Sequence, residues 1–309
     1  MALHVIVGKG PVGSATAEEL VRQGHTVRVL SRSGGISTDD VEHRRVDATD
    51  TDAVTAAGRG AAALYNAVNP AYTRWAEDWP PVAAALLAAA ERTGAVLVTM
   101  SNLYAYGRPT GPMTPETPLA ATDTKGRVRR RMWLDALAAH EAGRVRVTEA
   151  RAADFVGPQV SGDHSHLVRQ LEPIRRGRRV WVVGDPDAPR SWAYLPDVAR
   201  TLAVLGTDER ALGRAWHVPV DAPRSQREAV DDLAAALRRS APPVTGMPWW
   251  VLRSLGTVVP FLREVVGVRH QFDQPFVTDA SATTSTFGLT PTPWPEVVAA
   301  TAGTAPAPA

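Results

Sequence analysis

The sequence predicts an α/β protein built on a parallel sheet with helices on both faces. Strand-like apolar runs, such as LHVIV at 3–7, TVRVLS at 26–31 and AVLVTMS at 95–101, alternate with helix-like segments. These runs are apolar almost throughout, which is typical of strands buried on both faces of a parallel sheet. The alternation itself is the pattern of successive βαβ units. We therefore expect a doubly wound sheet whose ligands bind at the carboxyl ends of its strands.

The other elements follow the same order along the chain. The segment TAEELVRQG predicts the first helix, and HRRVD at 43–47 and AAALYNAV at 61–68 predict two further strands. An Ala-rich helix ends at Arg92, and a second long helix, GRVRRRMWLDALAAHEAG, leads into a strand at 145–154. RAWHVPV at 214–220 predicts a later strand that returns to the sheet.

The domain organisation follows from where this regular pattern stops. Segments 158–189 and 240–275 are irregular and richer in Pro and Trp. We predict a core over 1–157, a smaller substrate-binding region over 158–300 that interleaves with it, and a disordered Ala/Pro-rich tail over 301–309. The smaller region should cover the carboxyl edge of the sheet, where open α/β sheets bind ligands.

Composition excludes several classes of function. Lys and Arg number 34 against 32 Asp and Glu, so the charge gives no reason to expect a nucleic-acid partner. The absence of cysteine excludes disulfides, thiolate zinc sites and cysteine nucleophiles. His164 and His166 in GDHSH lack a clear third ligand, so no metal site is predicted.

No targeting segment stands out at the N-terminus, which enters a strand pattern within three residues. The longest apolar run, VAAALLAAA at 82–90, falls far short of the roughly 20 residues that span a bilayer. We therefore expect a cytoplasmic protein with no membrane partner.

The stretch GKGPVG at 8–13 carries the first functional signal. It has the spacing G-x-G-x-x-G and lies between a predicted strand and a predicted helix, which is the context of a Rossmann-type dinucleotide site. Gly8 would make the tight turn, Gly10 would let the backbone approach a pyrophosphate, and Gly13 would let the helix pack close to the strand. The phosphates would then lie at the helix N-terminus, beside Pro11 and Val12.

The end of the second strand indicates which dinucleotide binds. An acidic residue there would accept from the ribose 2′-hydroxyl of NAD, but the chain has Ser31, Arg32 and Ser33. A cation flanked by hydroxyls suits a 2′-phosphate, so we predict NADP(H). Arg32 as a solvated loop residue is the alternative. Asp47 after the third strand could accept from the adenine amino group or cap its own loop.

Taken together, the motifs resemble the extended and atypical short-chain dehydrogenase/reductase superfamily, of the NAD-dependent epimerase/dehydratase kind. The resemblance covers most of the chain. It rests on VGKGPVG, VDATD, LYNAVNP, SNLYAYG, EARAADFVGP and RSWAYLPDVAR, which occur in the order of the family. Extended members usually space their first glycines as GxxGxxG, whereas this chain has the GxGxxG of several atypical branches. The resemblance adds Ala67, Val68 and Asn69 to the expected cofactor site.

The catalytic motif of that family is missing. In the family, a Ser or Thr after the fifth strand works with a Tyr-x-x-x-Lys pair on the next helix, where the Lys lowers the pKa of the Tyr. Here the serine position falls at Asn102, just after Ser101, and KGRVR stands where the pair should be. Lys125 therefore takes the place of the tyrosine and Arg129 that of the lysine. In the alternative register, the tyrosine position holds Ala121.

Three sources could replace the missing phenolic proton. Lys125 is a reluctant acid unless neighbouring cations lower its pKa, and it could instead hold the cofactor together with Arg129. Tyr104 lies two residues after Asn102, so on an extended segment both side chains point the same way. A hydroxylated substrate could also supply its own proton. Asn102 is the expected donor to the carbonyl oxygen of the substrate.

The resemblance and these residues predict an NADP(H)-dependent ketoreductase that acts on a bulky, polycyclic aromatic natural product. It would be similar to tyrosine-lacking ketoreductases of the superfamily, such as the angucyclinone ketoreductase of simocyclinone biosynthesis. Trp249, Trp250 and Phe155 are the candidate substrate contacts, although both tryptophans could simply pack. The alternatives are a non-catalytic NADP-binding sensor similar to NmrA-like regulators and a non-redox epimerase or lyase. A small-molecule substrate is the expected partner, and the chain is expected to be a monomer or a homodimer.

Overall fold

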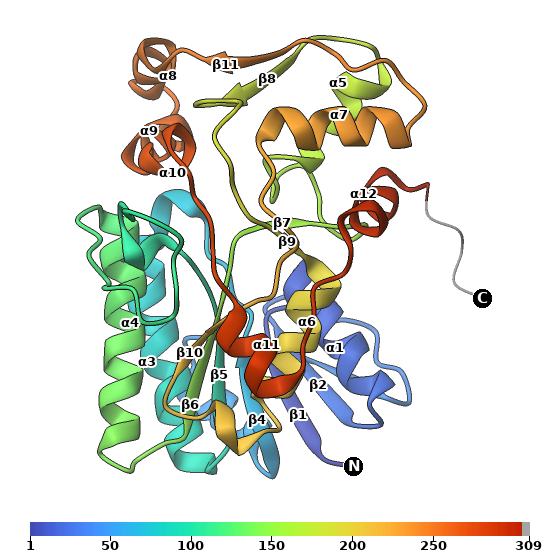
Figure 1. Ribbon diagram of the computed structural model, residues 1–309. Coiled ribbons are helices and arrows are strands. Elements are labelled where there is room, and N and C mark those ends of the chain that lie inside the picture. Colours follow the sequence, from blue (N-terminus) through green and yellow to red (C-terminus); the bar gives the residue numbers. More distant parts are fainter. Residues whose placement is uncertain (305–309) are drawn as a thin grey trace.

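The computed structural model describes residues 1–304, and a seven-stranded parallel sheet runs through its centre (Figure 1). The strand order is β10-β6-β5-β4-β1-β2-β3. The strands are β1 (Leu3–Val7), β2 (Thr26–Ser31), β3 (Val41–Arg45), β4 (Ala61–Asn66), β5 (Val96–Asn102), β6 (Val147–Ala152) and β10 (Ala215–His217). Every pairing within this sheet is parallel. The predicted doubly wound α/β sheet is thereby confirmed, and the strand order reverses between β1 and β4.

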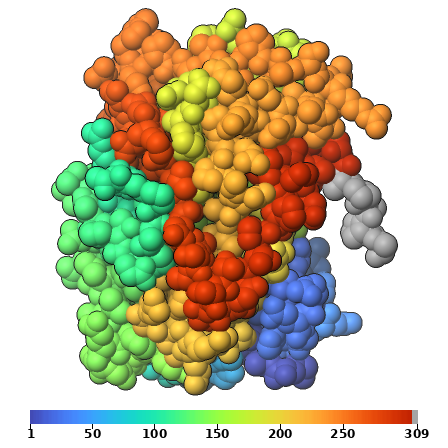
Figure 2. Space-filling model, viewed as in Figure 1, coloured from blue at the N-terminus to red at the C-terminus, as the bar shows by residue number. Residues whose placement is uncertain are grey.

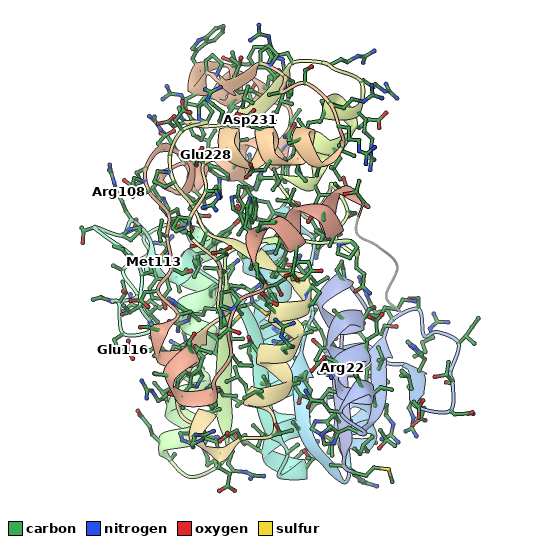
Figure 3. All side chains as sticks on the ribbon, turned by 45° about the vertical axis from the view of Figure 1, so that its right-hand side comes forward. Arg22, Arg108, Met113, Glu116, Glu228 and Asp231 are labelled. Carbon is green, nitrogen blue, oxygen red and sulfur yellow. The ribbon has the colours of Figure 1, made fainter. Side chains whose placement is uncertain are left out.

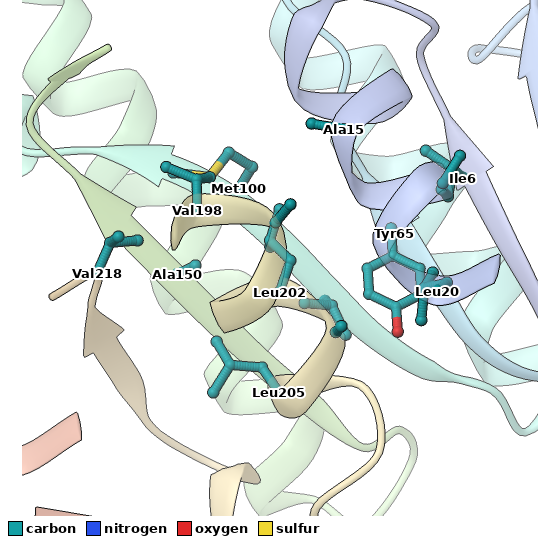
Figure 4. Packing of buried hydrophobic residues seen from close by; sticks show 14 of the residues in the cluster. Ile6, Ala15, Leu20, Tyr65, Met100, Ala150, Val198, Leu202, Leu205 and Val218 are labelled. Carbon is teal, nitrogen blue, oxygen red and sulfur yellow. The ribbon is translucent and has the colours of Figure 1, made fainter. Parts of the chain in front are cut away.

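Helices cover both faces of the sheet. On one face, α1 (Pro11–Arg22) packs on α6 (Leu195–Leu205), and on the other α3 (Trp75–Thr93) lies between α2 (Thr51–Gly58) and α4 (Thr124–Glu141). The strands supply apolar side chains to both layers, and Val5 and Ile6 in β1 are fully buried. Figure 4 shows the first of these cores, in which Leu20 and Leu202 pack over the sheet.

A smaller region lies over the carboxyl ends of the strands (Figure 1). It contains two short parallel strand pairs, β11 with β8 and β7 with β9, which are separate from the central sheet. Its elements are β7 (Asp154–Val156), η3 (Val168–Gln170), α5 (Leu171–Arg175), β8 (Val180–Val183), β9 (Trp192–Tyr194), α7 (Gln226–Ala236), β11 (Val244–Met247), α8 (Trp249–Gly256), α9 (Pro260–Gly267), α10 (His270–Asp273) and α12 (Trp294–Ala302). The segments that looked irregular in sequence thus contain short helices and strands whose cores form between distant parts of the chain.

The C-terminal segment, which begins after α10, connects the smaller region to the core. It descends from α10 to α11 (Ser281–Phe287) and then returns to α12, and Figure 2 shows it (red) lying across the face of the molecule. On the way, Met113 donates its N–H to the Val277 carbonyl at 2.8 Å and accepts from the Asp279 N–H at 2.7 Å. Met113, labelled in Figure 3, belongs to the loop that precedes α4. The segment therefore fixes this loop, and with it the start of α4.

Several predicted boundaries differ from the observed ones for local reasons. β3 ends at Arg45, before the predicted end at 47, because Asp47 turns the chain by accepting from the N–H of Thr49. The strand predicted over 145–154 divides into β6 and β7, and β7 pairs with β9 outside the central sheet. The predicted strand at 214–220 is shorter, over Ala215–His217, and pairs with β6.

The predicted tail begins inside a helix. Thr301 and Ala302 are buried at the end of α12, so this part of 301–309 is ordered by packing. The remainder of the predicted tail, 305–309, lies outside the described residues. Among the helices of residues 1–304, none combines the length and the apolar character needed to cross a membrane.

Candidate active site

A single cavity of about 1130 Å³ follows the carboxyl ends of the strands and continues beneath the smaller region. It begins at the glycine loop and reaches the residues that follow β2, β4 and β5. Of the residues predicted from sequence, its lining includes Gly8, Gly10, Pro11, Val12, Ser31, Arg32, Ser33, Asp47, Ala67, Val68, Asn69, Ser101, Asn102, Tyr104, Arg129 and Phe155. The fold thus brings most of the predicted site residues to one place.

The glycine loop has the geometry of a phosphate cradle. Gly8 has φ +111°, and a Cβ there would lie 2.7 Å from the carbonyl carbon of Ala67. A Cβ on Gly13 would overlap the carbonyl oxygen of Gly8, which lets α1 begin directly against the turn. Gly10 has free space in place of such contacts, because a Cβ there would meet no protein atom within 4 Å. The missing side chain therefore leaves open space above the start of α1.

The N–H groups at the start of α1 are available to a ligand. A helix leaves its first N–H groups without intrahelical partners, and no side chain caps this one. No acidic residue lies in the first turn, so the positive end of the helix dipole is not compensated there. The loop therefore fits the pyrophosphate of a dinucleotide in both shape and charge.

The loop after β2 presents Arg32 to the cavity. The Arg32 side chain is exposed, and it forms no hydrogen bond or ion pair within residues 1–304. Its neighbours are engaged, because the Ser31 hydroxyl donates to the Gly34 carbonyl at 3.1 Å and Lys9 donates to the same oxygen at 2.8 Å. The guanidinium of Arg32 is thus free to bind an anion.

Asp47 lies opposite Arg32 but is held by its own loop. Its carboxylate accepts from the backbone N–H and the hydroxyl of Thr49, at 2.9 and 2.8 Å. These bonds, together with the nearby charge of Arg32, lower the pKa of Asp47. One oxygen of the carboxylate makes both bonds, which leaves the other oxygen as an acceptor.

The end of β5 and the segment after it place three polar residues, Ser101, Asn102 and Tyr104, in the lining of the cavity. Asn102 accepts the backbone N–H of Tyr104 on its Oδ1 at 3.2 Å, which leaves its amide N–H groups as donors. Ser101 is buried, and its side chain acts to lower the pKa of the Glu149 carboxyl group. Burial raises the pKa of Glu149, and the adjacent Arg151 opposes that rise.

A second tyrosine joins Tyr104 in the cavity. Tyr72, in the 3-10 helix η1 (Tyr72–Arg74), has its hydroxyl 3.2 Å from that of Tyr104, in the 3-10 helix η2 (Tyr104–Tyr106). Burial is the main cause that raises the pKa of Tyr104 to about 12, and it raises the pKa of Tyr72 as well. Both phenols are therefore protonated near neutral pH and act as hydrogen-bond donors.

Lys125 lies outside the lining of the cavity, which corrects the prediction that it faces the reaction centre. Its ammonium is paired with Glu264 of α9 at 3.1 Å and donates to the Tyr72 carbonyl. It also lies 3.8 Å above the centroid of the Tyr72 ring. The residue at the position of the family tyrosine thus holds α9 against η1.

Arg129 lies one helical turn further along α4 and lines the cavity. Its side chain is buried, and the guanidinium stacks on Trp75 and Trp79, with its Cζ 4.7 and 4.2 Å from the ring centroids. Within residues 1–304, Nε and Nη1 are buried without a hydrogen-bond partner. Burial lowers its pKa to about 10, so the group is still cationic at neutral pH.

The smaller region gives the cavity an apolar wall. Of the three candidate substrate contacts, Phe155 lines the cavity, whereas Trp249 and Trp250 do not. Trp249 donates its indole N–H to Asp273 at 2.6 Å, and Trp250 is 67% exposed. The aromatic and aliphatic side chains that replace them come from α9, α10 and the segment that follows: Phe261, Val265, Val268, Phe272 and Phe276.

The two histidines of GDHSH also line the cavity, where they serve packing and loop structure. His164 is hydrogen-bonded to the Ser161 hydroxyl at 2.8 Å. His166 stacks edge-on against Phe272, and burial lowers its pKa to about 4. In the described part of the chain, no group of three or more His, Cys, Asp or Glu side chains is placed to hold a metal ion.

The sequence analysis did not identify Tyr72 as a residue of the site, nor Trp75, on which Arg129 stacks. Both depend on NPAYTRW, which follows β4 and supplies Tyr72 and Trp75. The available signal was the position of this aromatic-rich stretch directly after a buried strand, at the ligand-binding edge of the sheet.

Comparison with known proteins identifies the family to which this chain belongs. The model of the family described as "NAD dependent epimerase/dehydratase family" matches residues 5–218. The chain belongs to this family. A search of curated proteins gave no match.

Solved structures show that the fold of this epimerase/dehydratase family member extends over nearly the whole chain. A dTDP-glucose 4,6-dehydratase from Bacillus anthracis, in complex with NAD, has a TM-score of 0.80 at 15% identity, covering 98% of this chain and 96% of that chain. A UDP-glucose 4-epimerase from Thermotoga maritima, with UDP-glucose, has 0.79 at 16% identity and 98% of both chains. The Bordetella bronchiseptica enzyme WbmH, in complex with NAD+, has 0.74 at 20% identity, again over 98% of both.

Proposed function

We propose that this family member is an NADP(H)-dependent oxidoreductase that reduces a ketone on a bulky, polycyclic aromatic natural product. The observation that carries the proposal is the continuity of the cavity. It joins a glycine loop, a free arginine and an apolar wall in one space of about 1130 Å³. This volume exceeds the upper end of typical small-ligand pockets, about 1,000 Å³, and so leaves room for a large ligand.

The residues present support a nicotinamide dinucleotide, which is also the ligand of two of the solved neighbours. The N–H groups of α1 would hold the pyrophosphate above Gly10, where a Cβ would meet no protein atom within 4 Å. Those neighbours contain NAD, but the side chain that follows β2 here is Arg32 and no carboxylate accompanies it in Ser31–Ser33. A guanidinium favours a 2′-phosphate, which is the reason for proposing NADP(H).

The proposed chemistry follows from the groups at the ends of β4 and β5. When bound, the reduced cofactor supplies a hydride. Asn102 would donate an amide N–H to the oxygen that gains charge, in the manner of an oxyanion hole. The apolar side chains of Phe261 and Phe272 would hold a flat ring system and exclude water from it.

A non-catalytic NADP-binding sensor is the second candidate. The absence of the Tyr-x-x-x-Lys pair favours it, because general acid catalysis contributes about 10²- to 10⁴-fold to the rate and must come from elsewhere if the protein is an enzyme. A non-redox epimerase or lyase would use the same cavity.

The test mixes purified protein with NADPH and a panel of quinones and polyketide ketones. Loss of the absorbance of NADPH, with an alcohol product two mass units heavier by mass spectrometry, supports the ketoreductase. Binding of NADPH without its oxidation by any compound would favour the sensor. Conversion of a substrate with no net change in NADPH would favour the epimerase or lyase.

A further inference from the structure

The two cavity tyrosines come from separate elements but form one hydroxyl pair. Tyr72 follows β4 and Tyr104 follows β5, and their oxygens are 3.2 Å apart. The Trp75 ring packs against both, with centroid distances of 5.4 Å to Tyr72 and 5.7 Å to Tyr104. The pair lines the same cavity as Asn102, Val68 and Asn69, the residues expected near the nicotinamide, and Asn102 accepts the backbone N–H of Tyr104.

Close packing of α4 against η2 puts a cation next to this pair. A Cβ on Gly126 would lie 2.5 Å from the carbonyl oxygen of Tyr104, so only glycine allows the approach. Asp123 caps α4 by accepting from the Gly126 N–H at 2.8 Å, which fixes the start of the helix. The next turn then delivers Arg129 to the same Trp75 ring that contacts Tyr104.

The charge of the buried Glu149 acts to raise the pKa of Arg129, but that carboxylate is paired with Arg151 at 2.6 Å, so within residues 1–304 Arg129 is a buried cation without an ion pair of its own. It forms no ion pair or hydrogen bond within residues 1–304, and two of its nitrogens are fully enclosed. Aromatic stacking offsets part of the cost of burying such a charge. A negative charge that develops in the cavity would offset more of it, since Coulomb interactions are strong where water is excluded.

The charges around the two hydroxyls make Tyr104 the better acid. Burial raises the pKa of Tyr104, and the hydrogen bond with Tyr72 is the main influence that lowers it; Asp154 adds to the rise, while the charges of Arg129 and Arg190 oppose it. For Tyr72, burial raises the pKa most, Tyr104 raises it further, and the charges of Glu264 and Asp154 act in the same direction. Lys125 lies over the Tyr72 ring and does not take this role, since its charge is paired with Glu264.

We propose that Tyr104 transfers its phenolic proton to the substrate oxygen, with Arg129 as the counter-charge and Tyr72 as the donor that stabilises the phenolate. The step rests on the proposed ketone reduction. The carbonyl carbon accepts the hydride of the reduced nicotinamide, and its π electrons move to the oxygen. The oxygen then takes the proton of Tyr104, and water that enters after product release restores the phenol. A tyrosine and a cation from new positions thereby replace the pair missing from α4.

The activity test measures single-turnover hydride transfer in variants that remove one group each. Tyr104→Phe is expected to slow the transfer by about 10²- to 10⁴-fold while the Kd for NADPH stays unchanged. Tyr72→Phe and Arg129→Met should give smaller losses, with partial recovery in Arg129→Lys. Tyr194→Phe, which changes a tyrosine outside the cavity lining, is the matched control and should react at the wild-type rate. Full hydride transfer in Tyr104→Phe would overturn the proposal.

A second readout does not depend on turnover. Replacing Tyr104 with 3,5-difluorotyrosine lowers the phenol pKa into a range where fluorine NMR can follow it in folded protein. In the Arg129→Met background, this pKa should rise by about one unit or more, which is a tenfold decrease in the acid dissociation constant of the phenol. An unchanged pKa would overturn the pairing with Arg129. If the wild type reduces no ketone, the proposed function fails, while this titration still decides whether Tyr104 and Arg129 act as a pair.

Discussion

Substitutions at two neighbouring glycines test the phosphate cradle in opposite ways. In Gly13→Ala, the new methyl group would overlap the Gly8 carbonyl and lie 2.9 Å from its carbon, and a backbone atom cannot move aside cheaply. Overpacking of this kind costs about 1–3 kcal/mol, so we expect a free energy of unfolding about 2 kcal/mol lower. Thermal and urea unfolding of the protein without nucleotide would measure this loss.

Gly10→Ala should do the reverse. Gly10 has φ −70°, which alanine adopts without strain, and its Cβ would project into open space. Stability should therefore stay the same or rise by about 0.4–1 kcal/mol. The methyl group would occupy the space where a pyrophosphate approaches, so the Kd for NADPH should increase at least about tenfold, or roughly 1.4 kcal/mol. Fluorescence titration with NADPH measures this, and wild-type affinity in Gly10→Ala would refute the cradle.

Three further outcomes are expected. Arg32→Asp should weaken binding of NADPH by about 10- to 100-fold without weakening that of NADH, because the variant loses a charge-assisted contact to the 2′-phosphate. Calorimetry with both nucleotides measures this, and an equal loss of affinity for both would contradict the role of Arg32. Glu264→Gln should destabilise the protein by about 2 kcal/mol, since the buried Lys125 loses its partner while the partly exposed site relaxes. Burial lowers the pKa of Lys125 below 10.5 and Glu264 opposes that shift, so Lys125 loses its proton at a lower pH in the variant than in the wild type. The deficit should therefore be full at neutral pH and shrink as pH rises toward 10.5, where Lys125 becomes neutral in both folded proteins; a constant deficit in urea unfolding across pH would contradict the argument. Trp250→Ser should leave the Kd for NADPH and the melting temperature almost unchanged, because the side chain is 67% exposed and lies outside the cavity lining, and a clear loss in either would show a missed contact.

The parts of the molecule that could be predicted from sequence are those set by local patterns. The apolar run LHVIV, the glycine spacing after it and the helix that follows are continuous in sequence, so the parallel sheet and the position of the loop followed directly. Asn102 ends β5 as the strand pattern indicated, but Tyr104 reaches the cavity from the 3-10 helix η2 and not from the extended segment on which its direction was predicted.

What could not be predicted depends on contacts between distant segments. Lys125 is kept out of the cavity by Glu264, which lies 139 residues further along the chain and has no sequence signal of its own. Trp249 is held by Asp273, and the apolar wall comes instead from Phe261 and residues of α10. Periodicity identifies which face of a helix is apolar, but it does not identify which segment covers that face.

Isothermal titration calorimetry with NADPH and NADH tests the central claim most directly. The arrangement of Gly10, the uncapped start of α1 and Arg32 predicts heat of binding for both nucleotides, with tighter binding of NADPH. If neither nucleotide produces heat at millimolar concentration, the cavity is not a dinucleotide site, and the proposed ketone reduction and the role of Tyr104 both fail.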